Sequence, residues 1–156
     1  MNPDLDLSLQ RVIRAPRAAV WKAWTDPDRF AKWWIPAPAV CRVDRLEPHA
    51  GGALRTSVSD GGSAFAPHMD AAFLVVDDLE RLVFTNAVDS AWRPATPQPV
   101  AMTAEITFAD HPDGTDYRVL VRHGDPAARA HHEKLGFLDG WGTVTGQLAR
   151  EAEQLS

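Results

Sequence analysis

Residues 126–156 read PAARAHHEKLGFLDGWGTVTGQLAREAEQLS, and this stretch decides the fold. At about 100° per residue, its apolar positions fall within about a third of a helical circle. Asp125 and Pro126 stand where a helix would begin, because a carboxylate can cap the first turn and proline lacks an N–H that would have no partner there. The sequence therefore predicts one long C-terminal helix that lies on another layer. Its apolar side is predicted to contain Leu135, Leu138, Trp141, Thr145, Leu148, Ala152 and Leu155.

Four glycines interrupt this predicted helix: Gly136, Gly140, Gly142 and Gly146. Each glycine costs about 1 kcal/mol relative to alanine in a helix interior. One interpretation is that the glycines let the helix backbone approach a sheet closely. The other is that the missing side chains leave space for a ligand.

Composition describes one ordinary globular domain. The 156 residues are enough for one core and too few for two comfortable ones. A net charge of −5, without a run of lysines or arginines, argues against nucleic acid or an anionic membrane surface as a partner. The single cysteine, Cys41, excludes an internal disulfide and is expected to be structural. We expect residues 1–4 to form an N-terminal tail and residues 5–156 a single domain.

Location is predicted from two features of the hydropathy pattern. No window approaches 18 uninterrupted apolar residues, so no membrane span is expected. The N-terminus is acidic and lacks the apolar core of a signal peptide. We therefore expect a soluble, cytoplasmic protein. An exposed sheet edge could support a homodimer, although nothing in the sequence requires one.

Between residues 5 and 123 the pattern predicts two short helices and mostly strands. Residues 5–10 alternate as a first strand, and Pro16 then opens a helix. A second short helix is expected to hold Phe30, Trp33 and Trp34. Period-two alternation predicts about six more strands, at residues 40–46, 53–59, 69–76, 82–88, 102–108 and 117–123.

Short polar or glycine-containing turns join several of these strands, which indicates hairpins and an antiparallel sheet. Strands grouped in sequence, with the helices kept apart, indicate the α+β fold class. A sheet that curls around one long helix leaves an interior between them, and such an interior suits a small molecule.

Several motifs in the same order resemble a known family. The quoted stretches are residues 15–27, Trp33-Trp34, residues 80–85 (ERLVFT), residues 92–94 (WRP), residues 132–137 (HEKLGF) and Gly140-Trp141. Together they resemble the AHSA1-like branch (activator of Hsp90 ATPase homologue-like) of the START/Bet v1-like SRPBCC superfamily. The resemblance covers residues 5–155. It implies a helix-grip fold, in which a curved antiparallel sheet grips the C-terminal helix around an elongated cavity, with two short helices after the first strand.

Histidines are the candidate acid–base groups, since the unperturbed pKa of histidine near 6.5 suits proton transfer around neutrality. His123 shares a strand face with apolar residues, and His131 falls on the inner side of the helical wheel. His132 is expected to be more exposed. His68 precedes a strand and could reach the same end of the cavity. His123 and His131 are therefore the catalytic candidates, with half-exposed structural histidines as the alternative.

Aromatic residues are the candidate ligand contacts, because tryptophan offers a large apolar surface and one N–H donor. Six tryptophans are present, and most could instead belong to the core. The predicted ligand-binding set is Trp33, Trp34, His68, Phe73, Phe84, Trp92, Met102, His123, His131, Phe137 and Trp141.

Three functions remain open at this point. The first is a binding protein for an apolar ligand, aromatic or lipid-like, held in an internal cavity. The second is an enzyme of cyclase, hydratase or isomerase type that uses a cavity histidine as acid or base. The third, implied by the resemblance, is a module that interacts with a chaperone. No metal site or cofactor is predicted, because no histidine pair on one helical face and no Cys-x-x-Cys spacing is present.

Overall fold

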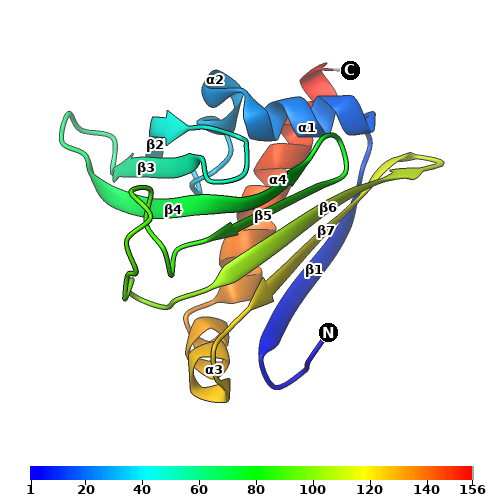
Figure 1. The fold of residues 1–156 in the computed structure, drawn as a ribbon. Coiled ribbons are helices and arrows are strands. Elements are labelled where there is room, and N and C mark those ends of the chain that lie inside the picture. Colours follow the sequence, from blue (N-terminus) through cyan, green and yellow to red (C-terminus); the bar gives the residue numbers. More distant parts are fainter. Residues whose placement is uncertain (156) are drawn as a thin grey trace.

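The structure, a computed structural model, describes residues 1–155 and has an α+β architecture. Seven strands form one antiparallel sheet in the order β1-β7-β6-β5-β4-β3-β2, and the long helix α4 crosses one face of it (Figure 1). The strands are β1 (Asp6–Ile13), β2 (Val40–Leu46), β3 (Ala53–Ser59), β4 (Ala66–Asp77), β5 (Arg81–Thr85), β6 (Thr103–His111) and β7 (Gly114–Arg122). The helices are α1 (Arg17–Thr25), α2 (Pro27–Phe30), α3 (Pro126–Lys134) and α4 (Phe137–Leu155).

The predicted fold class, the strand order along the chain and the hairpins are confirmed. Residues 40–46 and 53–59 have the predicted bounds, whereas the predicted strand at residues 82–88 ends at Thr85. The second short helix, α2, ends at Phe30, so Trp33 and Trp34 lie in the turn that follows it. This difference matters because the turn places the ring of Trp34 against Trp24 of α1 on one side and Trp141 of α4 on the other.

The single C-terminal helix predicted for residues 126–156 is wrong, because the chain breaks between α3 and α4. Gly136 has a φ of 96°, the left-handed conformation in which glycine commonly ends a helix. Its N–H donates to the carbonyl of Glu133 over 3.0 Å, which closes the last turn of α3. The helix start was predicted correctly, since Asp125 accepts a hydrogen bond from the N–H of Ala128. Ser156, included in the prediction, lies outside the described residues.

The break explains one of two errors in the predicted apolar stripe: Leu135 lies before the break, whereas Leu138 lies after it, on α4 itself. Thr145, Leu148 and Ala152 are buried as expected, but Leu135 is 54% exposed and Leu138 is 62% exposed. A helical wheel assumes a constant rotation of about 100° per residue along the whole segment. The turn at Gly136 interrupts that rotation, so the inward-facing sides of α3 and α4 are not aligned.

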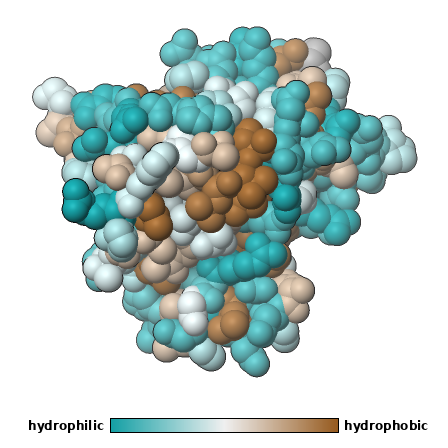
Figure 2. All heavy atoms as spheres, viewed as in Figure 1, coloured by the Kyte–Doolittle hydropathy of each residue, from teal (hydrophilic) through white to brown (hydrophobic). Residues whose placement is uncertain are grey.

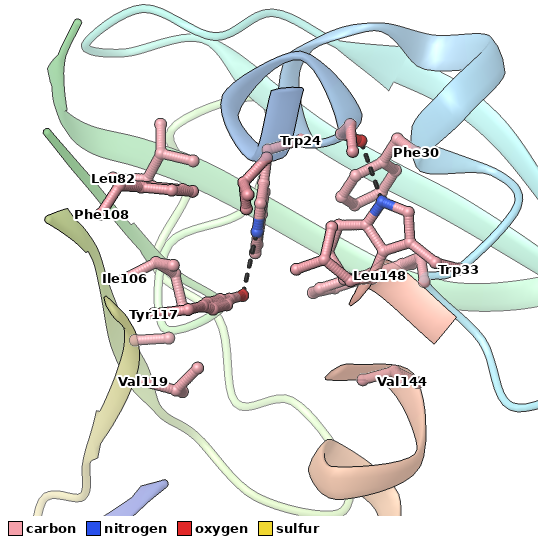
Figure 3. Packing of buried hydrophobic residues seen from close by; sticks show 14 of the residues in the cluster. Trp24, Phe30, Trp33, Leu82, Ile106, Phe108, Tyr117, Val119, Val144 and Leu148 are labelled. Atoms are coloured by element: carbon pink, nitrogen blue, oxygen red, sulfur yellow. Dashed lines mark hydrogen bonds between the residues drawn. The ribbon is translucent and has the colours of Figure 1, made fainter. Parts of the chain in front are cut away.

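Aromatic residues fill the core between α1, α4 and the inner face of the sheet (Figure 3). Trp24 on α1 donates from Nε1 to the hydroxyl of Tyr117 on β7 over 3.0 Å, and both side chains are buried. Trp33 donates from Nε1 to the carbonyl of Ala23 over 2.9 Å. The indole N–H groups of Trp24 and Trp33 therefore each have an acceptor, as low-polarity surroundings require.

The opposite face of the sheet is partly charged and partly apolar. Glu105 on β6 forms ion pairs with Arg81, at 3.2 Å, and with Arg122, at 3.0 Å. Figure 2 shows apolar side chains gathered over β4 and β5 near the middle of the view. Leu74 on β4 is among the exposed large hydrophobic residues. No helix within residues 1–155 is long and apolar enough to cross a membrane.

Candidate functional site

An apolar pocket of about 420 Å³ lies beside the break between α3 and α4. Its walls come from the turn after α2, the start of β4, the segment before β6 and the first turns of α4. Because α4 starts anew at Phe137, its first turns present one side of the helix to this space. The apolar lining includes Trp34, Met102, Phe137, Trp141 and Val144.

Glycines contribute directly to this space. Gly136 and Gly140 line the apolar pocket, and a Cβ added at Gly140 or Gly142 would meet no atom within 4 Å. Close approach to the sheet is therefore not the reason for glycine at these two positions. At Gly146 an added Cβ would lie 3.7 Å from the side chain of Arg11, an ordinary contact. The interpretation that missing side chains leave space fits Gly136 and Gly140.

A second cavity, the polar hollow, adjoins the apolar pocket and has a volume of about 500 Å³. It is lined by polar side chains that the apolar pocket lacks, including Asp70, Asn86, Asp89 and Gln98. The two cavities adjoin, and five residues line both of them, which we call the shared wall. The shared residues are His68, Met69, Pro99, Met102 and His132.

The turn that carries Trp34 is fastened to α4 by one side chain. Nε2 of Gln147 donates to the carbonyl oxygens of Trp33 and Ile35, over 2.9 Å each. Its Oε1 accepts from the N–H of Ala37 over 2.8 Å. Gln147 is buried, and its bonds to Trp33 and Ile35 satisfy carbonyl groups inside the protein. These bonds fix the position of the turn, and with it Trp34, relative to α4.

His132 on α3 lies in the shared wall and is joined to a second histidine. Its Nδ1 lies 2.8 Å from Nε2 of His123, which directly follows β7. Nδ1 of His123 in turn lies 2.7 Å from the carbonyl oxygen of Leu5. Burial, followed by the nearby His123 and His131, lowers the pKa of His132 to about 4. His132 is therefore neutral near pH 7.

His68 on β4 is the other histidine of the shared wall. Its Nδ1 lies 3.0 Å from the hydroxyl of Thr56 on β3, and its ring meets that of Trp34 edge-on. Burial lowers the pKa of His68 below the usual histidine range. Both histidines of the shared wall thus offer uncharged imidazoles to the cavities at neutral pH.

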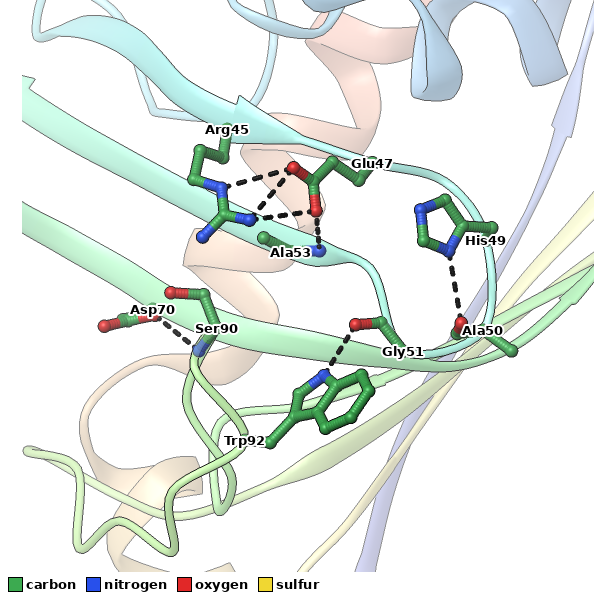
Figure 4. Close-up of polar contacts among 9 residues, drawn as sticks. All are labelled: Arg45, Glu47, His49, Ala50, Gly51, Ala53, Asp70, Ser90 and Trp92. Atoms are coloured by element: carbon green, nitrogen blue, oxygen red, sulfur yellow. Dashed lines mark hydrogen bonds and ion pairs between the residues drawn. The ribbon is translucent and has the colours of Figure 1, made fainter.

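Five of the predicted ligand-binding residues come together at the apolar pocket: Trp34, His68, Met102, Phe137 and Trp141. Trp33, Phe73 and Phe84 lie instead in the buried core. Trp92 is 69% exposed, and its Nε1 donates to the carbonyl of Gly51 over 2.7 Å (Figure 4). Trp92 lines neither cavity.

The predicted orientation of the histidines on α3 is wrong. His131, expected to face inward, is exposed, whereas His132, expected outside, lines both cavities. The reason is again the helix break, which removes the phase relationship between α3 and the buried side of α4. His123 is buried as expected, but it reaches the cavities only through His132.

Other lining residues were missed by sequence reasoning: Pro36, Met69, Pro99, His132, Leu135, Gly136, Gly140 and Val144. The glycines carried a signal, since four of them in one predicted helix is costly. The prolines lie in irregular segments whose path depends on tertiary contacts, and no periodicity could place them.

Trp34 carries an unusual polar group. Its Nε1 is buried and has no hydrogen-bond partner among the described residues. Leaving a buried donor unpaired costs about 1–3 kcal/mol, and such groups are rare in native structures. No group of three or more histidine, cysteine, aspartate or glutamate side chains within residues 1–155 could hold a metal ion.

A curved antiparallel sheet that grips a long C-terminal helix beside a pocket is the helix-grip architecture of SRPBCC-like proteins. The family model described as "Activator of Hsp90 ATPase homolog 1-like protein" matches residues 14–153. The chain therefore belongs to the AHSA1 family. A comparison with curated protein sequences gave no match.

Solved structures agree with this assignment. Protein NE0264 from Nitrosomonas europaea is 35% identical, with a TM-score of 0.86 and coverage of 99% of this chain and 97% of its own. Protein CV1439 from Chromobacterium violaceum is 26% identical, with a TM-score of 0.71 and coverage of 94% and 96%. An AHSA1-like protein from Aeromonas hydrophila is 22% identical, with a TM-score of 0.69 and coverage of 97% and 94%, and shows the fold alone.

Proposed function

We propose that the protein binds a small, mainly apolar molecule, with an aromatic portion, in the apolar pocket between α4 and the turn after α2. The observation that carries this proposal is the pocket itself. Its volume of about 420 Å³ falls within the range of about 300–1,000 Å³ typical of small-molecule sites. Trp34, Phe137 and Trp141 supply flat apolar surfaces, and an aromatic ligand can pack against them edge-on or offset.

Two further features support this proposal. The unpaired Nε1 of Trp34 belongs to a residue of the pocket wall, so a polar group of the ligand is one candidate partner for it. Gly140 keeps space open at a cost in helix stability, since it lies inside α4 and lines the pocket. A helix selected for stability alone would carry alanine at Gly140.

Titration with N-phenyl-1-naphthylamine, whose fluorescence rises in apolar surroundings, tests the proposal. We expect one molecule to bind per chain. The Gly140→Leu variant should weaken binding about tenfold or more, because the added side chain fills the pocket. Gly142→Leu is the matched control, since Gly142 lies on the same helix, is exposed and does not line the pocket. Absence of binding to the parent protein, or equal binding by both variants, would refute the proposed site.

An enzyme is the second candidate, and the imidazole pair of His123 and His132 favours it. Two hydrogen-bonded imidazoles could move a proton away from a bound substrate. A pKa of about 4 makes His132 a weak base, however, which favours binding over proton abstraction. Deuterium uptake by 2-tetralone in D₂O, followed by NMR, tests this function. An enzyme should accelerate exchange and lose the acceleration in His132→Ala, whereas exchange at the buffer rate would contradict it.

The chaperone-interacting module has weaker support. The matching family description names an activator of Hsp90 ATPase homolog. A module of this kind would be expected to combine a filled interior with an exposed apolar surface. Apolar side chains do gather over β4 and β5, but the interior beside α4 holds a pocket. The ligand-binding function therefore accounts for more of the structure.

A further inference from the structure

The chain of contacts from Leu5 through His123 to His132 determines where the protons lie. A carbonyl oxygen can only accept a hydrogen bond. Nδ1 of His123, 2.7 Å from the carbonyl oxygen of Leu5, must therefore carry a hydrogen. In a neutral imidazole only one nitrogen carries a hydrogen, so Nε2 of His123 is then an acceptor.

The same reasoning extends to the second imidazole. Because Nε2 of His123 accepts, Nδ1 of His132, 2.8 Å away, must donate. The hydrogen of His132 is thus placed on Nδ1, and its Nε2 holds a free lone pair. His132 lines both cavities, and its Nδ1 edge is turned toward His123. Nε2 is therefore the ring nitrogen of His132 that remains able to accept a hydrogen bond from a molecule in the cavities.

The opposite arrangement would need a cation at His123, with both of its nitrogens donating. His123 is buried, and a buried charge is costly without a partner of opposite charge. Among residues 1–155, no carboxylate lies within ion-pair distance of His123. The favoured state is therefore the one in which both imidazoles are neutral. In that state Nε2 of His132 is a hydrogen-bond acceptor.

We infer that the ligand of the apolar pocket carries a hydroxyl or N–H group that donates to Nε2 of His132. This inference rests on the proposed function and names the class of ligand: a flat apolar body with one hydrogen-bond donor at the edge that meets the shared wall. His132 is the residue that selects for the donor. His123 is a positioning residue, because it acts only by fixing the hydrogen on Nδ1 of His132.

A matched pair of ligands tests the inference. 2-Naphthol carries a donor, and 2-methoxynaphthalene has a similar body without it. The parent protein should bind 2-naphthol about two- to tenfold more tightly, the worth of one net hydrogen bond. Equal affinities, or tighter binding of the methyl ether, would overturn the inference while leaving the proposed function intact. Failure of both compounds, and of N-phenyl-1-naphthylamine, would overturn both.

Two substitutions at position 132 separate the acceptor from the imidazole ring. His132→Asn can keep a donor near the position of Nδ1 but removes the acceptor at Nε2, so the preference for 2-naphthol should disappear. His132→Gln can place a carbonyl oxygen near the position of Nε2 and should keep the preference. His131→Asn, exposed on the same helix, is the control and should behave as the parent. A preference that survives His132→Asn would refute the role of His132.

The protonation pattern can be measured without any ligand. Two-bond ¹H–¹⁵N NMR correlations of the imidazoles distinguish a protonated ring nitrogen from a bare one. At pH 7.5 we expect Nδ1 of His132 to be protonated and Nε2 to be bare. The His123→Phe variant should shift both signals of His132 toward the average of the two tautomers and should weaken the preference for 2-naphthol. A protonated Nε2 in the parent protein would overturn the inference whatever the binding results.

Discussion

Gln147 on α4 and Trp33 in the turn after α2 are joined by a buried hydrogen bond of 2.9 Å, from the side-chain amide to the backbone carbonyl. The next residue, Trp34, is a wall of the apolar pocket, so this bond sets the pocket wall through the backbone. Gln147 also serves Ile35 and Ala37, and a single side chain therefore satisfies three backbone groups.

Replacement of this amide should be costly. Gln147→Leu introduces a side chain of similar size but leaves these backbone groups unpaired. We expect a loss of about 2–5 kcal/mol in the free energy of unfolding. Urea denaturation measures the loss. Gln154→Leu, an exposed position on the same helix, is the control and should change stability by less than about 0.5 kcal/mol. Similar stabilities of the two variants would show that Gln147 does not hold the turn.

Tyr117 is the only tyrosine of the chain, so its ionisation can be followed cleanly by absorbance near 295 nm. Burial raises the pKa of Tyr117 far above its usual range. The folded protein should show no tyrosinate signal at pH values where a free tyrosine ionises, and the signal should appear only with unfolding. Above about pH 10 the unfolded state loses a proton that the folded state keeps, so stability should fall as pH rises. A reversible titration near pH 10 in the folded protein would contradict this.

Tyr117→Phe tests the hydrogen bond within the same core. The change leaves Nε1 of Trp24 buried without its acceptor. We expect a loss of about 1–3 kcal/mol in the free energy of unfolding, measured by thermal or urea denaturation. An unchanged stability would mean that the indole N–H finds another acceptor.

His132 should make stability depend on pH in the mildly acidic range. Its pKa is about 4 in the folded protein and near 6.5 in an unfolded chain. Between these values the unfolded state binds a proton that the folded state does not, so stability should fall as pH drops from about 6.5 toward 4. His68, whose pKa burial also lowers, should act in the same direction.

Urea denaturation at several pH values measures this dependence. His132→Asn should flatten the slope in the window between about pH 6.5 and 4, because one of the titrating groups is gone. The titratable groups near His132 are His123 and His131, and His68 belongs to the same shared wall. Identical slopes for the parent and the variant would refute the lowered pKa.

Two glycines near the start of α4 should respond oppositely to alanine. Gly136 has a φ of 96°, so Gly136→Ala should cost about 1–2 kcal/mol. Gly142 lies within α4 with open space around it, so Gly142→Ala should stabilise by about 0.5–1 kcal/mol. Thermal denaturation of the two variants shows whether each substitution raises or lowers the stability. A stabilising Gly136→Ala would mean that α3 and α4 can join into one helix, as the sequence alone predicts.

The sequence was a good guide to elements and a poor guide to the site, for a physical reason. Alternating strands and hairpin turns are local signals, and they located the sheet nearly completely. Which residues line a pocket depends on how helices and strands pack against one another. A local periodicity in the sequence carries no information about that packing. One residue in the left-handed conformation, Gly136, was enough to exchange the roles of His131 and His132.

Aromatic residues show the same limit. Trp33 and Trp34 are neighbours in the chain and both are buried in the core, yet only Trp34 also lines the pocket. The difference comes from the turn that Gln147 fastens, and that contact joins residues far apart in sequence. The sequence predicts both tryptophans as ligand contacts but does not show which of them lines the pocket.

The bond between His123 and the carbonyl of Leu5 links the chemistry of the pocket to the first residues of the chain. Leu5 precedes β1 and lines neither cavity. If His132 selects the ligand as proposed, removing Leu5 would free the imidazole pair to exchange its hydrogens, and the pocket would then accept donors and acceptors alike. A truncation that removes Leu5 is therefore expected to change ligand choice, although Leu5 itself touches neither cavity.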